Sequence, residues 1–197
     1  MNRREALITI GGGGAIGAGM LAGGSLYGSS TLDIEREDDR TVVRKDGERI
    51  DSLSNAVTPV EDDDALLGVS IPERATAARV AVEVVWAIRR DGLWSDITVE
   101  LTTTGDVEAP LNPGRATAYR SPWGRSPSEA SGSMFSQRRY AYPRGTTAGH
   151  VDTALSVQAG TDPEESVIEL EARLSARSFS GTRVEVTAPA EMTYSPE

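Results

Sequence analysis

Strict alternation between apolar and polar side chains over residues 168–177 constrains the fold of this chain more than any other feature. Successive side chains of a β-strand point to opposite faces of a sheet, so a period of two puts one face in a core and the other in water. The segment therefore predicts a half-buried strand. Its two faces are Ile168, Leu170, Ala172, Leu174 and Ala176, and Glu169, Glu171, Arg173, Ser175 and Arg177.

A helix over residues 163–178 is the competing interpretation of this region. Pro163 suits the first position of a helix, and Val167, Leu170 and Leu174 would share one helical face. We favour the strand because the period of two has no exception, whereas the helical match rests on a few apolar positions.

The same alternation recurs along the chain, in residues 79–89, 97–102, 151–157 and 184–187, with turn residues between the segments. We expect 79–89 and 97–102 to be neighbouring antiparallel strands of one sheet. About seven to nine short strands of this kind predict an all-β fold, an antiparallel β-sandwich of immunoglobulin-like or jelly-roll-like type.

Turn pairs mark where the strands reverse direction. Asp46-Gly47 and Ser180-Gly181 each combine a small polar residue with a glycine, which takes a positive φ readily. Each pair stands between two strand-like segments, so we expect a hairpin at both positions.

The N-terminal segment predicts export from the cytoplasm. Residues 6–32 contain no charged side chain, and they follow Arg3-Arg4 and precede Asp33. A basic end, an uncharged run and an acidic flank are the layout of an export signal. The arginine pair and the glycine-rich, mildly apolar run are typical of the twin-arginine type.

Cleavage of this segment stays open. The small residues at 22–24 and 28–30 are compatible with a signal peptidase site, but neither is a strong Ala-x-Ala sequence. An uncleaved run is long enough to span a bilayer, for which about 20 residues suffice. The chain thus divides into an export signal or N-terminal transmembrane anchor, residues 1–32, and one β-sandwich domain, residues 33–197. We expect the protein outside the cytoplasm, secreted or at the cell surface.

The spacing Gly12-x-Gly14-x-x-Gly17 in the same segment has the form of a dinucleotide-binding loop. Such a loop must open a helix, and the glycines that continue to Gly28 make a poor one. We therefore expect no cofactor.

Charge and cysteine content narrow the class of protein. The net charge is −10, Lys45 is the single lysine, and there is no cysteine. An acidic, lysine-poor chain is typical of halophilic proteins, although a GC-rich genome also makes lysine scarce. An acidic protein would repel the phosphates of a nucleic acid. Without cysteine the domain has neither disulfides nor thiolate metal sites, so packing or assembly must hold it together.

One segment differs in charge from the rest of the chain. Residues 109–149 contain six arginines against one acid, Glu129, and half of the ten aromatic residues. They lie in a stretch, 104–149, that reads as a long loop, and a loop longer than about fifteen residues is usually functional or disordered. The candidate partner-binding residues are Arg115, Tyr119, Arg120, Trp123, Arg125, Arg138, Arg139, Tyr140, Tyr142 and Arg144.

The chemistry of this segment indicates an anionic partner. Arginine binds carboxylates and sulfates in a planar fork, and tyrosine and tryptophan add contact area at low entropic cost. An acidic surface-layer protein, an anionic glycan or the acidic face of a second copy would suit it. The alternative is that the arginines pair with carboxylates of the same chain and the rings cover the end of the sandwich.

No catalytic constellation is evident in the sequence. His150 and Asp152 would share a strand face, but one histidine with one carboxylate is more often structural than catalytic. The acidic run at 61–64 lacks the alternating ligands and glycine of a calcium loop and reads as a solvated turn. We expect no enzyme activity and no catalytic, cofactor or metal site.

Arg3-Arg4, the glycine-rich run, the charged segment 33–44 and the Asp-rich element at 62–68 resemble a group of haloarchaeal twin-arginine-exported surface β-sandwich proteins of unassigned function. That group is distantly similar to the TasA and camelysin-like β-sandwiches, which build surface fibres. The resemblance implies a non-enzymatic surface protein that makes structural contacts with itself or with other envelope components. The alternative is a binding module for an anionic glycan or a surface-layer protein, and a secreted enzyme is the third hypothesis.

Overall fold

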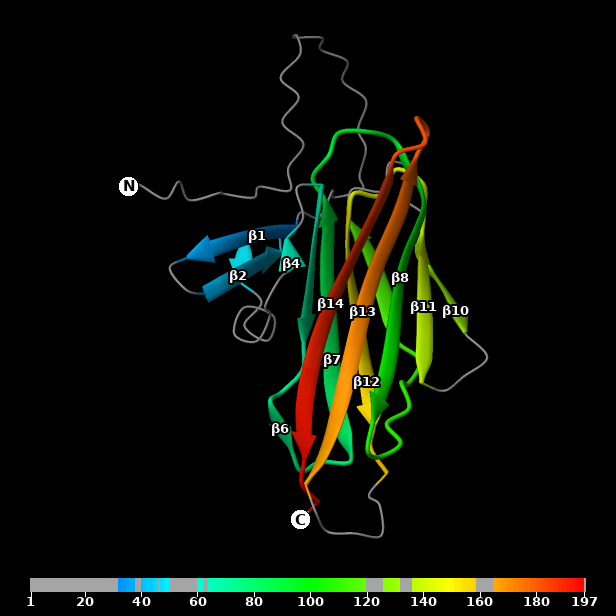
Figure 1. Cartoon of the computed structure of the whole chain (residues 1–197). Helices are drawn as coiled ribbons and strands as arrows, with labels where there is room; N and C mark the ends of the chain where they lie inside the picture. Colours follow the sequence, from blue (N-terminus) through cyan, green and yellow to red (C-terminus); the bar gives the residue numbers. More distant parts are fainter. Residues whose placement is uncertain are drawn as a thin grey trace.

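The protein is built of β-strands arranged in three sheets (Figure 1). The computed structural model describes residues 32–37, 40–45, 47–49, 60–61, 64–119, 126–131, 136–158 and 165–196. Within these residues every regular element is a strand, so the prediction of an all-β fold is confirmed.

Two larger sheets form a sandwich. The six-stranded sheet contains, in order, β10 (Ser128–Ser131), β11 (Gln137–Tyr142), β8 (Trp94–Gly105), β13 (Ser166–Ser178), β14 (Arg183–Tyr194) and β6 (Arg74–Ala75). The five-stranded sheet contains β4 (Val60–Glu61), β5 (Ala65–Ser70), β7 (Arg79–Ile88), β12 (Ala148–Ser156) and β9 (Arg115–Tyr119). Neighbouring strands run antiparallel except β14 and β6, which pair in parallel.

A third, smaller sheet precedes the sandwich in the chain. It consists of β1 (Leu32–Glu37), β2 (Arg40–Lys45) and β3 (Glu48–Arg49), and β2 and β3 form the hairpin predicted around Gly47. Gly47 has a φ of +84°, a conformation that glycine adopts without strain. The export segment lies outside the described residues, except that Leu32, expected to end it, begins β1. In the described part of the chain no helix is long and apolar enough to span a membrane.

The inner faces of the two larger sheets enclose one apolar core. β13 runs through the segment of strict alternation, and its five apolar residues are buried in this core. The strand prediction for residues 168–177 is therefore confirmed, and the helix alternative is wrong over the part of 163–178 that the structure describes. The chain then turns at Ser180-Gly181 into β14, which confirms the second hairpin.

The expectation that residues 79–89 and 97–102 pair with each other is wrong. β7 lies between β5 and β12 in the five-stranded sheet, whereas β8 lies between β11 and β13 in the six-stranded sheet. Residues 89–93 carry the chain from one sheet to the other, so the apolar faces of β7 and β8 meet across the core. Alternation specifies which face of a strand is buried, but it does not specify the neighbouring strand.

The second half of β7 is buried on both faces, which explains why Val85 interrupts its alternation. Val85 and Ala87 point away from the sandwich core and are nevertheless fully buried. On this outer face Ala87 is in register with Leu66 of β5 and with Ala148 of β12, and Ala148 is in register with Tyr119 of β9. All four are buried, so the five-stranded sheet carries a second apolar row outside the core.

An aromatic pair joins the two larger sheets. The rings of Trp86 on β7 and Tyr142 on β11 meet edge to face, with centroids 4.7 Å apart and an interplanar angle of 82°. Gly149 on β12 makes room for the pair, because a β-carbon there would lie 2.4 Å from Trp86 Nε1 and 2.5 Å from Tyr142 Cε1. The Tyr142 hydroxyl donates a hydrogen bond to the His150 carbonyl oxygen at 3.2 Å. Tyr142 therefore ties β11 to both β7 and β12.

The outer edge of β14 has few strand partners among the described residues, since β6 pairs only with Thr193 and Tyr194. The Thr193 N–H donates to the Glu73 carbonyl oxygen of the β6 side at 2.9 Å. Odd-numbered residues of β14 therefore direct their backbone polar groups to this edge. Pro189 is one of them, and it has no N–H to present there.

Truncation of Tyr142 should cost far more stability than truncation of an exposed aromatic residue. We expect Tyr142→Ala to lower the free energy of unfolding by about 3–5 kcal/mol, because it empties a buried site between the sheets. Phe179→Ala is the matched control; its side chain is 61% exposed, so the change should stay within about 1 kcal/mol. Denaturant-induced unfolding measures both values. Equal losses would contradict the inter-sheet role of Tyr142.

Candidate functional site

The stretch 104–149, expected to be one long loop, contains several strands. It holds the end of β8, the whole of β9, β10 and β11, and the start of β12. β9 has five residues, β10 four and β11 six, and such short strands carry little periodic signal. The candidate residues are consequently distributed over both larger sheets rather than gathered on one loop.

The ten predicted partner-binding residues lie in different environments. Three lie outside the described residues: Arg120, Trp123 and Arg125. Four are wholly or largely buried: Tyr119, Arg138, Tyr140 and Tyr142. Three are exposed: Arg115 on β9, Arg139 on β11 and Arg144 after β11.

Tyr140 and Tyr142 belong to the core and offer no surface to a partner. They point inward from β11 and are 0% and 6% exposed. Burial raises the pKa of both hydroxyls above the ordinary tyrosine value, because it disfavours the charged phenolate. Their aromatic character therefore serves inter-sheet packing, as the Trp86 contact of Tyr142 shows.

Arg138 is held inside the protein by its own chain. Its Nε donates a hydrogen bond to the Leu111 carbonyl oxygen at 2.9 Å, and a terminal guanidinium nitrogen lies 3.4 Å from Glu129 Oε1. The side chain is only 13% exposed. Arg138 thus fastens β10 and the connection between β8 and β9 to β11, as the alternative of pairing within the chain predicts.

Arg144 lies at one end of the sandwich beside two exposed apolar side chains. Its guanidinium carbon is 3.8 Å from the centroid of the Phe179 ring, a cation–π contact. The Phe179 N–H donates to the Leu93 carbonyl oxygen at 3.3 Å. Leu93 is 46% exposed and Phe179 61%, and no other large hydrophobic residue of the described chain is exposed. We call Leu93, Arg144 and Phe179 the end patch.

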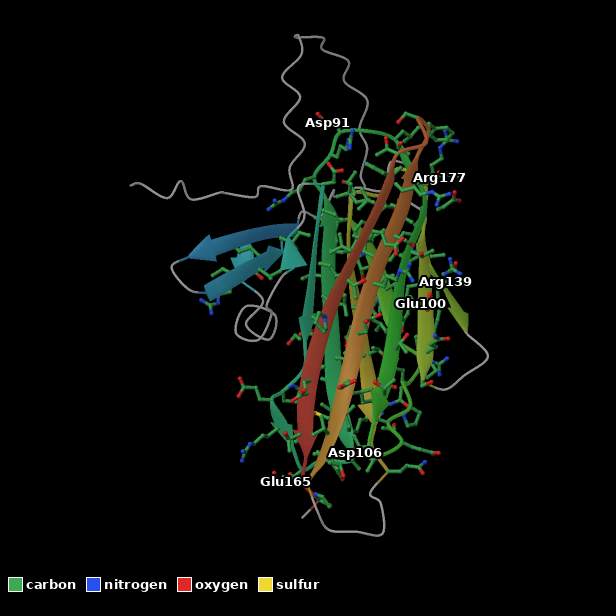
Figure 2. All side chains as sticks on the ribbon, viewed as in Figure 1. Asp91, Glu100, Asp106, Arg139, Glu165 and Arg177 are labelled. Atoms are coloured by element: carbon green, nitrogen blue, oxygen red, sulfur yellow. The ribbon has the colours of Figure 1, made fainter. Side chains whose placement is uncertain are left out.

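Three turns meet at the end patch, and hydrogen bonds order them. The β11–β12 turn is held to β8 because the Gly145 N–H donates to the Trp94 carbonyl oxygen at 2.8 Å. In the β13–β14 turn, the Thr182 N–H donates to Ser178 Oγ at 3.0 Å. In Figure 2 the labelled residues Asp91 and Arg177 mark this end of the sandwich, and Asp106 and Glu165 mark the opposite end.

Leu93 and Phe179 were not predicted as site residues, although the sequence carries a signal for both. Leu93 follows Asp91-Gly92, and Phe179 precedes Ser180-Gly181, so each large apolar side chain stands in a turn. Turn positions between alternating strands are normally polar, and a large apolar residue there indicates either burial or a contact surface.

The structure shows the surroundings of two weaker sequence motifs, His150 with Asp152 and the acidic run at 61–64. His150 lies on the outer face of the five-stranded sheet, with Nε2 3.8 Å from Glu83 Oε1, and Asp152 follows on the same face. Of the acidic run at 61–64, Asp64 accepts a hydrogen bond from Arg90 at 2.9 Å, whereas residues 62–63 lie outside the described chain. Within the described ranges no three His, Asp or Glu residues are placed to hold a metal ion.

Comparison with known proteins supports the fold. No family model matches the chain. The major pilin subunit of Bacillus cereus, as its D312A variant, is 8% identical with a TM-score of 0.51, and the match covers 84% of this chain and 60% of the pilin. The collagen-binding domain of a Staphylococcus aureus adhesin is 8% identical with a TM-score of 0.39, over 64% and 95% of the two chains. The two sheets packed around one core confirm the predicted sandwich, and the match to the pilin supports this fold.

The buried tyrosines predict a loss of stability at alkaline pH. An unfolded tyrosine ionises near pH 10, whereas burial holds the pKa values of Tyr140 and Tyr142 higher in the folded protein. Below that pH both states keep their protons. Above it only the unfolded state releases them, so the free energy of unfolding falls by about 1.4 kcal/mol per pH unit for each tyrosine.

Urea unfolding between about pH 9 and 11 measures this slope. The variant with Tyr140→Phe and Tyr142→Phe should lose most of it, because phenylalanine does not ionise. An equally steep decline in the double variant would show that other groups are responsible.

Proposed function

We propose that this is a non-enzymatic surface protein that works outside the cytoplasm and makes structural contacts with itself or with other envelope components. The observation that carries the proposal is the end patch, where Leu93 and Phe179 remain in water beside Arg144 on ordered turns. An exposed aromatic and an aliphatic side chain next to a guanidinium are the chemistry of a protein contact. The similarity in fold to a major pilin subunit supports the same role.

The N-terminal residues support the proposed location. Arg3-Arg4 and the uncharged residues 6–32 have the layout of a twin-arginine export signal, and the net charge of −10 suits a salt-rich environment. These features support a haloarchaeal surface protein, which residues 1–32 would anchor in the membrane if they are not cleaved.

A binding module for an anionic glycan or an acidic surface-layer protein is the second candidate, and Arg144 favours it. The guanidinium lies over the face of the Phe179 ring, and both side chains are exposed. A stacked guanidinium keeps its N–H edge available for a carboxylate or sulfate group.

The state of the native protein tests the proposal. The protein is recovered from cell envelopes and from the medium, and its N-terminal sequence and assembly size are determined. We expect it in these fractions, in assemblies larger than one chain. A membrane-bound monomer with an intact N-terminus would favour the binding module instead, and a protein confined to the cytoplasm would refute both candidates.

In a fibre, Leu32 and Ile34 would belong to a strand that adds to the sheet of the next subunit. β1 and β2 form no part of the two larger sheets, so the sandwich is complete without them. Deletion of residues 31–44 should therefore abolish fibres and leave a folded sandwich, as seen by electron microscopy and circular dichroism. Because Val42 and Val43 are buried, Leu32→Ser with Ile34→Ser is the milder companion variant. Fibres that persist in both variants would contradict this form of the proposal.

A further inference from the structure

We propose that the outer face of the β13–β14 hairpin binds the same face of a second copy of the chain, an inference that rests on the proposed self-contact and names its surface. The two strands are 13 and 12 residues long and lie side by side in the six-stranded sheet. In Figure 1 no described element lies in front of them. The charged residues exposed on this face are Glu169, Glu171, Arg173, Arg177, Arg183, Glu185 and Glu191.

Two like-charged pairs of opposite sign stand near the two ends of the hairpin. Arg177 is in register with Arg183 beside the turn, and Glu169 is in register with Glu191 toward the other end. Because the Thr193 N–H bonds to the β6 side, these pairs are non-hydrogen-bonded ones, in which opposite Cα atoms are only about 4.5 Å apart. Like charges directly opposite destabilise a sheet. Each pair therefore weakens the isolated chain, and an opposite pair brought by a partner would relieve it.

The middle of the hairpin is electrically balanced. Arg173 and Glu185 form an ion pair, and their side chains are 51% and 56% exposed. The face thus runs from a basic end through a neutral middle to an acidic end. The whole chain is strongly acidic, so the basic end is a local feature of this face and does not follow from the overall composition.

Apolar surface accompanies each charged pair. At the basic end lies the end patch, with Phe179 directly after β13. At the acidic end lies a groove of about 580 Å³ on the outer face, where exposed Pro189 stands among Glu169, Glu171 and Glu191. One end therefore presents an aromatic ring among arginines, and the other a groove in which a proline ring lies among glutamates.

A two-fold axis that crosses the middle of the hairpin brings the basic end of each copy against the acidic end of the other. When two hairpins stack in opposite directions, Arg177 and Arg183 of each copy meet Glu169 and Glu191 of the other. Closed two-fold dimers are the commonest symmetric assemblies. The net charge of −10 on each copy opposes association, and local complementarity of this kind offsets that repulsion.

Charge reversal tests the contact while each cross-strand pair of the hairpin remains like-charged. The R177E/R183E variant replaces one like-charged pair by another, and E169R/E191R does the same at the opposite end. Each variant carries one sign of charge at both ends, so self-association should fall by at least about tenfold. The controls R74E/R79E and E73R/E108R make the same change of net charge at exposed residues outside the hairpin and should associate as the unchanged chain does.

Mixing the two reversed variants of the full chain is the decisive measurement. One is acidic at both ends and the other basic at both ends, so the mixture should form heterodimers although neither variant associates alone. Sedimentation velocity at about 0.1 M and about 1 M salt measures this, and the dimer should weaken as salt screens the charges. Circular dichroism verifies that each variant is folded.

An unchanged chain that stays monomeric, or a mixture of folded variants that stays monomeric, would overturn the hairpin contact. The proposed function would survive either result, because it is tested by the location and assembly of the native protein. The hairpin dimer should also persist after deletion of residues 31–44, since that deletion leaves β13 and β14 intact.

Discussion

Packing between the two larger sheets carries the stability of this protein, because the chain has no cysteine with which to cross-link them. The Trp86–Tyr142 contact shows how closely the sheets approach, since the rings fit only where position 149 lacks a side chain. Gly114 makes room for Tyr140 in the same way, because a β-carbon at position 114 would lie 2.6 Å from Tyr140 Oη. A core packed this closely positions the turns and outer faces rigidly, and contact surfaces can be built on them.

The alternation of residues 168–177 was sufficient to predict β13 and its buried face, but alternation could not predict which strands are neighbours. Residues 79–89 and 97–102 were expected side by side, yet β7 and β8 face each other across the core. β11 escaped prediction for a different reason. Arg138 occupies an inward position of that strand, where hydrogen bonding to Leu111 and its contact with Glu129 satisfy its charge. A polar residue on the inward face breaks the pattern on which strand prediction depends.

Composition located an unusual segment at 109–149 but could not distinguish a ring in the core from a ring in water. Tyr140 and Tyr142 turned out to be core residues, whereas exposed Phe179 lies outside that segment. The like-charged pairs of the β13–β14 hairpin were hidden until the register was known. Once the turn at Ser180-Gly181 is placed, counting outward from it brings Arg177 opposite Arg183 and Glu169 opposite Glu191. Register therefore converts a sequence of scattered charges into a surface with two distinct ends.

The outer edge of β14 shows how the protein limits its own association. A free strand edge is a template on which further chains can stack without end, as they do in amyloid. Pro189 interrupts the row of N–H donors on this edge, and Arg183, Glu185 and Glu191 place charges along it. Backbone pairing on this edge is thereby discouraged by the chemistry of β14 itself. The face of the strand remains accessible, so copies can meet through side chains and part again when the salt concentration changes.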